Sequence, residues 1–491
     1  MVVLNRFKIR GVLALVACSA FLGAVPAARA ETDPHLFVVT ADLMRGSSTA
    51  IRLESPWVAT RDVESVGTLP IVRHFFGKHY VVSSTLGTIQ VIDPATFDTI
   101  TTFSVGEFSR PQDILLVDPQ TAYVSRYDST LLWKVNPETG VLLNTIHLEV
   151  FADADRLPEM SMMTLDRNHL FIQIQRVDRP SGNPVRPSYL AVVDVNTDTL
   201  VDVNAPLAGP PGIALEATIP SLKMHRDSRA RRLFVRAAGV RLDVSGGIEE
   251  IDLDALKSLG IFLPEAESIG DLGPFVMVSP DRGYAVGHTD ITPSSHLFMF
   301  TRTGGRVTNE LYLTFVEIES MAYDPATFQL YFPDSDTTVL GIHVFDTRTN
   351  EQLTRKPVLT GLPPRDLIVV RPPTLGAATD LRVSGIDPST GDLSISYRPA
   401  CGASDHNIVW GPLSNVSQYA YTGQDCSIGA GGTYDQFNPG AGSFFFVVVG
   451  TGPAGTEGSY GTDDTWTERP EDLLDPACLF TQDLSFSCDV W

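Results

Sequence analysis

The chain has few basic residues, few cysteines and no long apolar run after its N-terminus. Its 36 Lys and Arg face 58 Asp and Glu, so that the formal net charge is −22 over 491 residues. Such an acidic chain repels nucleic acid, which we exclude as a partner. No run beyond residue 30 approaches 18 apolar residues, so we expect no transmembrane segment in the mature protein.

Familiar enzyme signatures are absent as well. The sequence has no GxSxG, HExxH, CxxCH or P-loop motif, and no GxGxxG after a strand-like run. None of its ten histidines pairs with another at a spacing of four. These absences argue against common hydrolases, metalloproteases and nucleotide-dependent enzymes. They do not exclude a catalytic site whose residues come from loops far apart in the sequence.

The first 30 residues read as a secretory signal. Three basic residues precede an apolar run (11–25), and "ARA" (28–30) offers a small-residue cleavage site, which predicts export and cleavage after Ala30. The basic residues are Arg6, Lys8 and Arg10. With Arg29, the first 30 residues carry four basic residues and no acidic one, so the formal net charge of the remaining chain is −26. The alternative is a lipid anchor on Cys18, because "LVAC" resembles a lipoprotein cleavage box.

Four cysteines remain after removal of the signal, all near the C-terminus. They are Cys401, Cys426, Cys478 and Cys488. An even number in an exported chain predicts two disulfides, for which three pairings are open. We favour Cys401–Cys426 and Cys478–Cys488, because each closes a short loop. A zinc site is not expected, since no CxxC pair exists.

Strand-like runs centred on an aromatic residue recur along the chain. They cover 36–40, 79–84, 122–127, 170–175, 233–238, 283–288 and 330–335. Each is preceded by a short apolar run and followed by a second run with an Asp or Asn turn, as in "LLWKVNPET" (131–139). Four strands per repeat, at intervals of 43 to 63 residues, predict a β-propeller.

The order of the runs predicts how the ring closes. With strands a to d counted outward, the mature chain begins at a b strand, "LFVVT", and ends with an orphan a strand, "RDLIVVR" (365–371). That last strand can pair into the first blade and leave no long sheet edge exposed. We therefore expect an all-β fold with a seven-bladed β-propeller over residues 33–372.

Two repeats carry a resemblance to a known family. The stretch 110–146, with "AYVS" and "VNPET", resembles a YVTN-repeat propeller unit, and 79–100 is similar. Blade 6 departs from the pattern with "MFTRTGG" (299–305). The resemblance implies an exported or surface-associated protein of bacterial or archaeal type, and hardly any chemistry.

The C-terminal part has a different pattern. "RPPTLGAATD" (371–380) marks a boundary, and alternating strands with turns such as "DPSTGD" follow it. Residues 373–470 are therefore expected to form a small β-sandwich, which resembles the fibronectin type III fold. Residues 471–491 form a tail that contains the last two cysteines.

The long connections fall on one face of the predicted propeller. Strands alternate in direction, so b–c and d–a loops share a face, and the a–b and c–d turns on the other face are short. The long connections are 148–158, 176–188, 205–218, 238–247, 264–273 and 287–295. Such loops commonly carry function, which favours a binding face over blades 3 to 6. The alternative is that they are neutral insertions.

Basic residues on this face are the first binding candidates. Arg176, Arg179 and Arg186 lie in one Pro- and Gly-rich loop and suit a carboxylate or other anionic partner. Alternatively, they pair with Asp153 and Asp155 of the chain itself. Arg126 begins the gap 126–130 of the hairpin in blade 3 and is a further candidate.

Three acidic or histidine groups are metal candidates. Asp153, Asp155 and Glu159 suggest Ca²⁺, although they lack the spacing of an EF-hand. His288, Asp290 and His296 have ligand chemistry, but ordinary loop residues look the same. Asp463, Asp464 and Glu468, near the end of the predicted sandwich, could also hold Ca²⁺, or form a solvated acidic turn. No other cofactor is predicted.

These observations favour a secreted or cell-surface binding protein without enzymatic activity. The expected partner is a protein or carbohydrate at the cell surface, and the expected state is a monomer. The alternative is an exported propeller enzyme, similar to lactonases or quinone-dependent dehydrogenases, with a metal or cofactor in the central channel. A structural envelope protein is a third reading.

Overall fold

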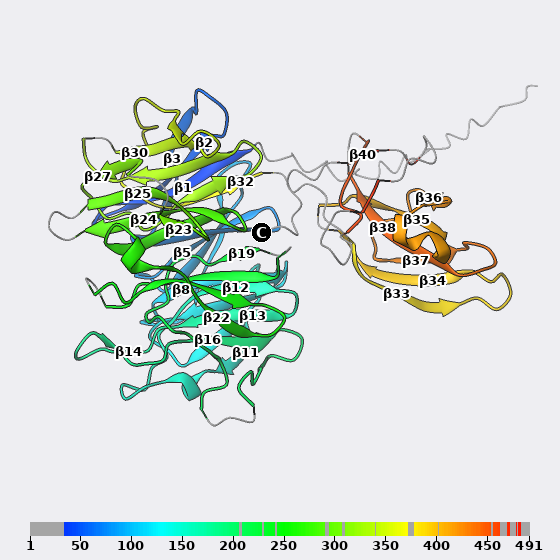
Figure 1. Cartoon of the computed structure of the whole chain (residues 1–491), viewed down its shortest axis with the longest axis horizontal. Helices are drawn as coiled ribbons and strands as arrows, with labels where there is room; N and C mark the ends of the chain where they lie inside the picture. The colour runs from blue at the N-terminus through cyan, green and yellow to red at the C-terminus, as the bar shows by residue number, and fades with distance from the viewer. Residues whose placement is uncertain are drawn as a thin grey trace, which may run out of the picture. The chain divides into compact units, whose positions relative to one another are not determined.

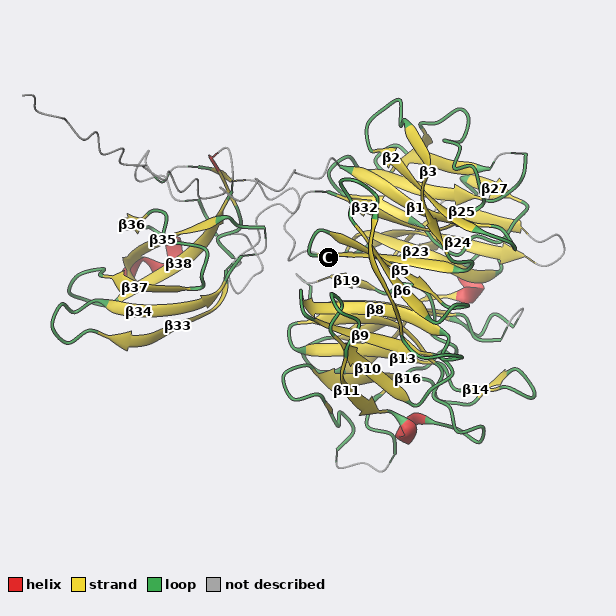
Figure 2. Ribbon diagram, turned by 180° about the vertical axis from the view of Figure 1, so that it is seen from behind, coloured by secondary structure: helices red, strands yellow, loops and turns green. Residues whose placement is uncertain are grey.

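The computed structural model describes residues 34–205, 209–227, 230–240, 243–289, 294–306, 310–338, 340–371, 378–400, 402–452, 455–461, 469–471, 478 and 480–482. The predicted signal segment, Cys18 and most of the linker after Arg371 lie outside these ranges. The described chain is all-β, as Figure 2 shows, and contains three short 3₁₀ helices. These are η1 (Glu149–Phe151), η2 (Glu265–Glu267) and η3 (Leu413–Gln418).

Antiparallel sheets follow one another along the propeller region, and we number them in chain order. Sheet 1 contains β1 (His35–Ala41), β2 (Gly46–Arg52), β3 (Ala59–Val66) and β32 (Pro364–Val370). Sheet 2 contains β4 (Pro70–Phe75), β5 (Lys78–Ser83), β6 (Thr88–Ile92) and β7 (Thr99–Ser104). Sheet 3 contains β8 (Pro111–Asp118), β9 (Thr121–Arg126), β10 (Leu131–Val135) and β11 (Leu142–His147).

The next two sheets interrupt this regular pattern with longer connections. Sheet 4 contains β12 (Met160–Asp166), β13 (His169–Ile174), β16 (Tyr189–Asp194), β17 (Thr199–Leu200) and β18 (Ile213–Ala214). A separate small hairpin, β14 (Val177–Asp178) and β15 (Asn183–Pro184), projects from its b–c connection. Sheet 5 contains β19 (His225–Asp227), β20 (Arg232–Ala237), β21 (Gly247–Asp252) and β22 (Lys257–Pro264).

Two more sheets complete this region. Sheet 6 contains β23 (Asp271–Ser279), β24 (Arg282–Thr289), β25 (Ser294–Thr301), β26 (Gly305–Arg306) and β27 (Tyr312–Thr314). Sheet 7 contains β28 (Ala322–Asp324), β29 (Gln329–Asp334), β30 (Gly341–Asp346) and β31 (Glu351–Gln352).

The repeated aromatic residue is the core residue of each second strand. The seven residues are Phe37, Tyr80, Tyr123, Phe171, Phe234, Tyr284 and Tyr331, all less than 2% exposed. The tyrosine hydroxyls also link neighbouring sheets, since Tyr123 donates to Asp198 and Tyr284 to the carbonyl of Thr347 (3.0 Å). A buried tyrosine usually finds such a partner, so the motif is a structural one.

The last strand of this region pairs with the first, as predicted. In Figure 1, β32 lies beside β1, although they come from opposite ends of the region. The two are antiparallel, with Val38 opposite Leu367. Leu36, Val38 and Leu367 join one apolar cluster with residues of sheet 7, so the closure is packed as well as hydrogen-bonded.

The C-terminal part contains two sheets. One has β33 (Thr379–Ile386), β34 (Leu393–Arg398) and β37 (Thr433–Phe437). The other has β35 (Asp405–Pro412), β36 (Gly423–Asp425), β38 (Phe444–Thr451), β39 (Thr456–Glu457) and β40 (Thr481–Gln482). Both contribute to one core, in which Ile395 and Phe437 meet Ile408 and Val448.

The disulfide pairing that we favoured is wrong. Cys426 bonds to Cys478, with Cα atoms 5.5 Å apart across a separation of 52 residues. Cys426 follows β36 and Cys478 precedes β40, and both strands belong to one sheet. The sheet therefore brings distant cysteines together, which a preference for short loops overlooks. Cys401 and Cys488 lie outside the described residues.

Within the described ranges, no helix has the length and apolar character needed to cross a membrane.

Candidate functional site

The predicted binding residues that the structure describes lie at one end of the strands. The b–c loops and the d–a loops meet there: the end of β1 contacts the start of β32, with the Ala41 amide donating to the Pro363 carbonyl (2.9 Å). The acidic group 153–159 lies between β11 and β12, and the arginine loop 176–186 lies between β13 and β16. We call this surface the loop face.

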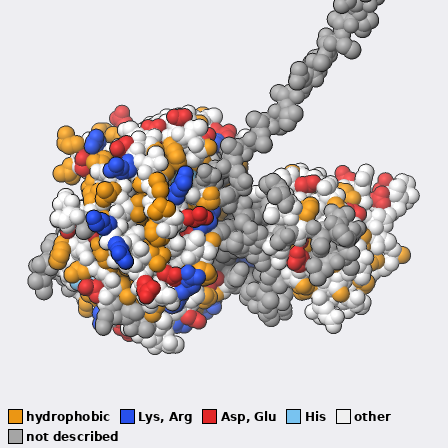
Figure 3. Space-filling model, turned by 90° about the horizontal axis from the view of Figure 1, so that it is seen from above, with side chains coloured by type: hydrophobic (Ala, Val, Ile, Leu, Met, Phe, Trp, Pro, Cys, Tyr) orange, Lys and Arg blue, Asp and Glu red, His pale blue; other side chains and the backbone are white. Residues whose placement is uncertain are grey.

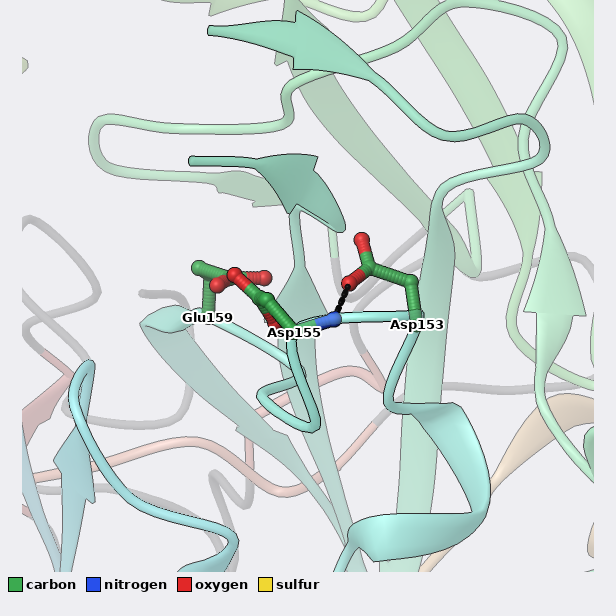
Figure 4. Close-up of side chains that lie close together, drawn as sticks. All are labelled: Asp153, Asp155 and Glu159. Carbon is green, nitrogen blue, oxygen red and sulfur yellow. Dashed lines mark hydrogen bonds between the residues drawn. The ribbon is translucent and has the colours of Figure 1, made fainter. Parts of the chain in front are cut away.

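The loop face brings the acidic group and one arginine together. Arg179 donates to Asp128 (2.7 Å) and Glu159 (3.1 Å), and its Nε lies 3.5 Å from Asp155. The Asp153 carboxylate accepts the Asp155 amide, drawn as the dashed line in Figure 4. Arg179 therefore pairs with carboxylates of the chain itself, which was the alternative to binding an anionic partner.

The same three carboxylates have the spacing of a cation site. Asp153, Asp155 and Glu159 each offer an oxygen within 4.8 Å of the others, and Figure 4 shows the three side chains gathered over one loop. Ca²⁺ accepts such oxygen ligands. A cation would have to compete with the Arg179 guanidinium for this charge, and calcium binding stays a prediction.

Glu159 is the most perturbed acid of this group. Its side chain is fully buried. Burial, together with the charges of Asp155 and Asp153, raises the pKa of Glu159 to about 7, despite bonds from the Val177 amide and Arg179 that lower it. A carboxyl group with this pKa exchanges its proton near neutral pH.

We expect Glu159 to make stability pH-dependent. Its ordinary pKa of 4.5 rises to about 7 on folding, so the folded protein binds more protons and its free energy of unfolding falls as pH rises from 4.5 through 7. The fall should reach up to about 3 kcal/mol. Glu159→Gln removes this contribution, so the stability of the variant relative to wild type should increase with pH, measured by urea unfolding at pH 5 and 8.

The control for this experiment is Glu138→Gln, a surface glutamate 3.3 Å from Lys78. It should follow the wild-type pH profile. An identical profile for Glu159→Gln and wild type would show that Glu159 titrates in an ordinary range.

The other arginines of the face bind three different parts of the chain. Arg176 donates to the carbonyl of Pro187 (2.9 Å), and Arg186 donates to that of Glu216 (3.2 Å). Arg126 is buried, donates to the Val105 carbonyl (2.9 Å) and stacks on a tryptophan ring. The structure therefore does not gather Arg176, Arg179 and Arg186 into one anion site.

The two candidate histidines of the loop face do not come together. His288 on β24 lies opposite Ser295, whereas His296 on β25 lies opposite Gly287. Opposed residues share a face of a sheet and consecutive residues alternate, so the two imidazoles point to opposite faces and cannot hold one ion. His296 instead contacts Glu310 (2.5 Å). Asp290 and the acids Asp463, Asp464 and Glu468 lie outside the described residues.

The loop face also carries exposed apolar residues that we did not predict. Leu43 (93% exposed), Met44 (89%) and Phe108 (90%) lie at loop tips, with Leu86 (64%) and Leu69 (55%) between them. Leu43 and Met44 belong to a b–c loop of sheet 1, Leu69 and Phe108 to d–a loops, and Leu86 to a b–c loop of sheet 2. We call these five residues the apolar row.

Contacts between the loops show that the loops of the row are neighbours. A Cβ at Gly46 would meet the Gly67 carbonyl, and one at Gly67 would meet the Leu86 side chain. Further along, the Val105 amide donates to the Gly87 carbonyl (2.9 Å). The row therefore crosses sheets 1 to 3, beside the predicted face rather than at its centre.

The centre of the propeller holds ion pairs between first strands. Neighbouring first strands contact one another there, as β32 does with β4 and β4 with β8. Arg73 on β4 binds Asp113 on β8 through two bonds (2.7 and 2.6 Å). Lys223, just before β19, reaches Asp366 on β32 (2.6 Å). This second pair joins sheets 5 and 1, which are not neighbours, and thus crosses the centre.

The two aspartates share a sequence pattern that sequence reasoning missed. "PQDILLV" (111–117) and "PRDLIVV" (364–370) both place Asp third in a first strand. Asp113 accepts the Met163 amide (2.8 Å), and Asp366 accepts the Val72 amide (2.9 Å), each from the neighbouring first strand. The repeated Pro-x-Asp marks a link between sheets.

A small pocket opens on the loop face beside this centre. It is open to solvent and is lined by Glu317, Ile318, Glu319, Pro333, Ser335, Pro364 and Arg365. Burial and the charge of Glu317 raise the pKa of Glu319. The pocket carries both signs of charge, and its polar lining separates it in chemistry from the apolar row.

Comparison with known proteins supports the fold. No protein-family model matches the chain, and no curated protein matches it in sequence. A proposed 6-phosphogluconolactonase from Bacteroides uniformis is similar in structure, at a TM-score of 0.50 and 12% identity, over 69% of this chain and 100% of that one.

Two further solved structures are similar. A proposed 6-phosphogluconolactonase from Bacteroides fragilis has a TM-score of 0.49 and 11% identity, over 69% of this chain and 98% of that one. The Dos1 propeller has a TM-score of 0.41 and 12% identity, over 65% and 72%. These likenesses carry no function to this chain.

Proposed function

We propose that the chain is an exported, non-enzymatic binding protein that acts through the loop face of a seven-bladed, YVTN-like β-propeller. The seven numbered sheets and the β1–β32 pairing support this ring. The two C-terminal sheets then form a fibronectin type III-like sandwich, and the Cys426–Cys478 disulfide suits an oxidising compartment.

The apolar row is the observation that carries the proposal. Isolated exposed apolar residues are ordinary on a protein surface, but several of them on neighbouring loops, with polar groups beside them, indicate an interaction site. Three of its side chains are about nine-tenths exposed. Burying a side chain of this kind stabilises a complex by about 1.5–3 kcal/mol, so the row can supply most of the affinity for a partner.

Contacts at the centre weigh against the alternative of a channel-centred enzyme. Arg73 and Lys223 are both engaged by carboxylates, at 2.6 Å in each case. A metal or cofactor bound between them would have to break these partly buried pairs, which costs stability. Binding at the loop face needs no such rearrangement.

The proposal predicts that the apolar row is needed for attachment to the cell surface. Wild-type protein should sediment with washed cell envelopes of the organism that produces it. The triple variant Leu43→Ser/Met44→Ser/Phe108→Ser should stay in the supernatant, with association weakened about tenfold or more because three buried contacts are lost.

The matched control is Val141→Ser/Leu142→Ser, which removes two exposed apolar side chains (56% and 44% exposed) outside the loop face. It should sediment like wild type. Equal sedimentation of the triple variant and wild type would disprove a binding role for the row.

A further inference from the structure

The apolar row is held rigidly at the tips of separate loops. The Asp42 carboxylate accepts the amides of Met44 (2.7 Å) and Arg45 (2.8 Å), which fixes the turn that presents Leu43 and Met44. The Ser109 hydroxyl donates to the carbonyls of Val105 (3.1 Å) and Gly106 (2.7 Å) next to Phe108. Each tip is thus preorganised and needs little ordering when it binds.

The chemistry beside the tips is polar and balanced in charge. Arg45 follows Met44 directly, and Arg110 lies two residues after Phe108, while Asp42 and Glu107 supply equal negative charge. Hydroxyl groups lie between the tips, where Thr68 and Thr85 contact each other at 3.1 Å. Figure 3, a view of the molecule from above, shows apolar, basic and acidic side chains mixed over the side of the propeller region that it displays.

We propose that the partner of the apolar row is the surface of a zwitterionic phospholipid bilayer. This inference rests on the proposed function and names its partner. Leu43, Met44 and Phe108 enter the interface, while Arg45 and Arg110 stay at the level of the lipid phosphates. Apolar side chains flanked by basic ones are typical of proteins that lie on a membrane.

Two features favour a lipid surface over a protein partner. Leu43 and Met44 project from one loop and Phe108 from another, and the three side chains are 89 to 93% exposed. A protein would have to provide a separate pocket for each tip, whereas a bilayer accepts all of them at once. The balanced local charge and the net charge of −22 favour neutral lipid over anionic lipid, which repels the chain.

Flotation with phosphatidylcholine vesicles tests the inference. Full-length wild-type protein should float with these vesicles, and 0.5 M salt should change the floated fraction little, because the contact is apolar. The triple variant should partition at least about tenfold less. Val141→Ser/Leu142→Ser should float like wild type.

A second variant separates binding from folding. Phe108 has φ +55°, a conformation that glycine adopts without strain. Phe108→Gly should therefore keep the wild-type thermal midpoint and still float less. Vesicles with added phosphatidylglycerol should bind no more protein than phosphatidylcholine alone.

Three results would overturn the inference: wild-type protein that stays below the vesicles, a triple variant that floats like wild type, or binding that requires phosphatidylglycerol. If envelope sedimentation still depends on the row when flotation fails, the binding function stands and its partner is a protein or carbohydrate of the envelope. If both fail, the binding function falls as well.

Discussion

Asp113→Ala is expected to lower the free energy of unfolding by about 3–5 kcal/mol, because it leaves a mostly buried cation without its partner. Asp113 is fully buried and binds Arg73 through both carboxylate oxygens. It also accepts the amides of Ile114 (2.9 Å) and Met163 (2.8 Å). The substitution therefore removes an ion pair and a link between sheets 3 and 4.

The state of Arg73 supports this expectation. Burial lowers the pKa of Arg73, but the charge and hydrogen bonds of Asp113, together with the charge of Asp366, outweigh burial, so that the pKa is raised overall. Without the Asp113 carboxylate, the main opposition to the cost of burial would be lost. Arginine stays protonated in proteins, so the guanidinium cannot escape this cost by losing its proton.

Urea unfolding of the variant at pH 7 provides the measurement, and Asp281→Ala provides the control. Asp281 also pairs with an arginine, Arg302, at 3.1 Å, but its side chain is 76% exposed. Exposed pairs contribute about 0–1 kcal/mol. A loss below about 1 kcal/mol for both variants would mean that water enters the centre and screens the Arg73 charge.

Local patterns predicted most of the fold. The aromatic runs mark second strands because a large side chain must be buried in each sheet, and Tyr123 and Tyr284 are buried as that logic requires. The closure followed from the order of strands alone, and Val38 does lie opposite Leu367. Strand pattern and turn chemistry are local properties, which is why the sequence displays them.

Contacts between segments that are distant in the chain could not be predicted from the sequence. Lys223 and Asp366 are 143 residues apart, and nothing in either segment names the other as its partner. The same is true of Cys426 and Cys478, which pair because two strands join one sheet. The acidic group 153–159 was found because its residues are close in sequence.

The apolar row was missed for a different reason. Its residues lie in short polar stretches such as "ADLMRG" (41–46) and "GEFSR" (106–110), which read as turns. Attention to long loops favoured blades 3 to 6, whereas the most exposed apolar side chains lie in short loops of sheets 1 to 3. A large apolar residue inside a polar turn is the signal that was available.

The closure of the ring predicts a second large effect, that of Leu367→Asp. Leu367 is 1% exposed and packs with Leu36 and Val38 of β1. Removing the leucine side chain from such a core costs about 2–5 kcal/mol, and the new carboxylate would be buried without a partner, next to Asp366. We expect the variant to lose at least about 4 kcal/mol.

Hydrogen exchange distinguishes opening of the ring from a general loss of stability. The amides of β1 (His35–Ala41) pair with β32, so they should lose protection before those of β9 in Leu367→Asp. The control Leu359→Asp, at a position that is 54% exposed, should change stability by less than about 0.5 kcal/mol. Uniform loss of protection in all sheets would mean that the closure unfolds together with the whole propeller and is no separate weak point.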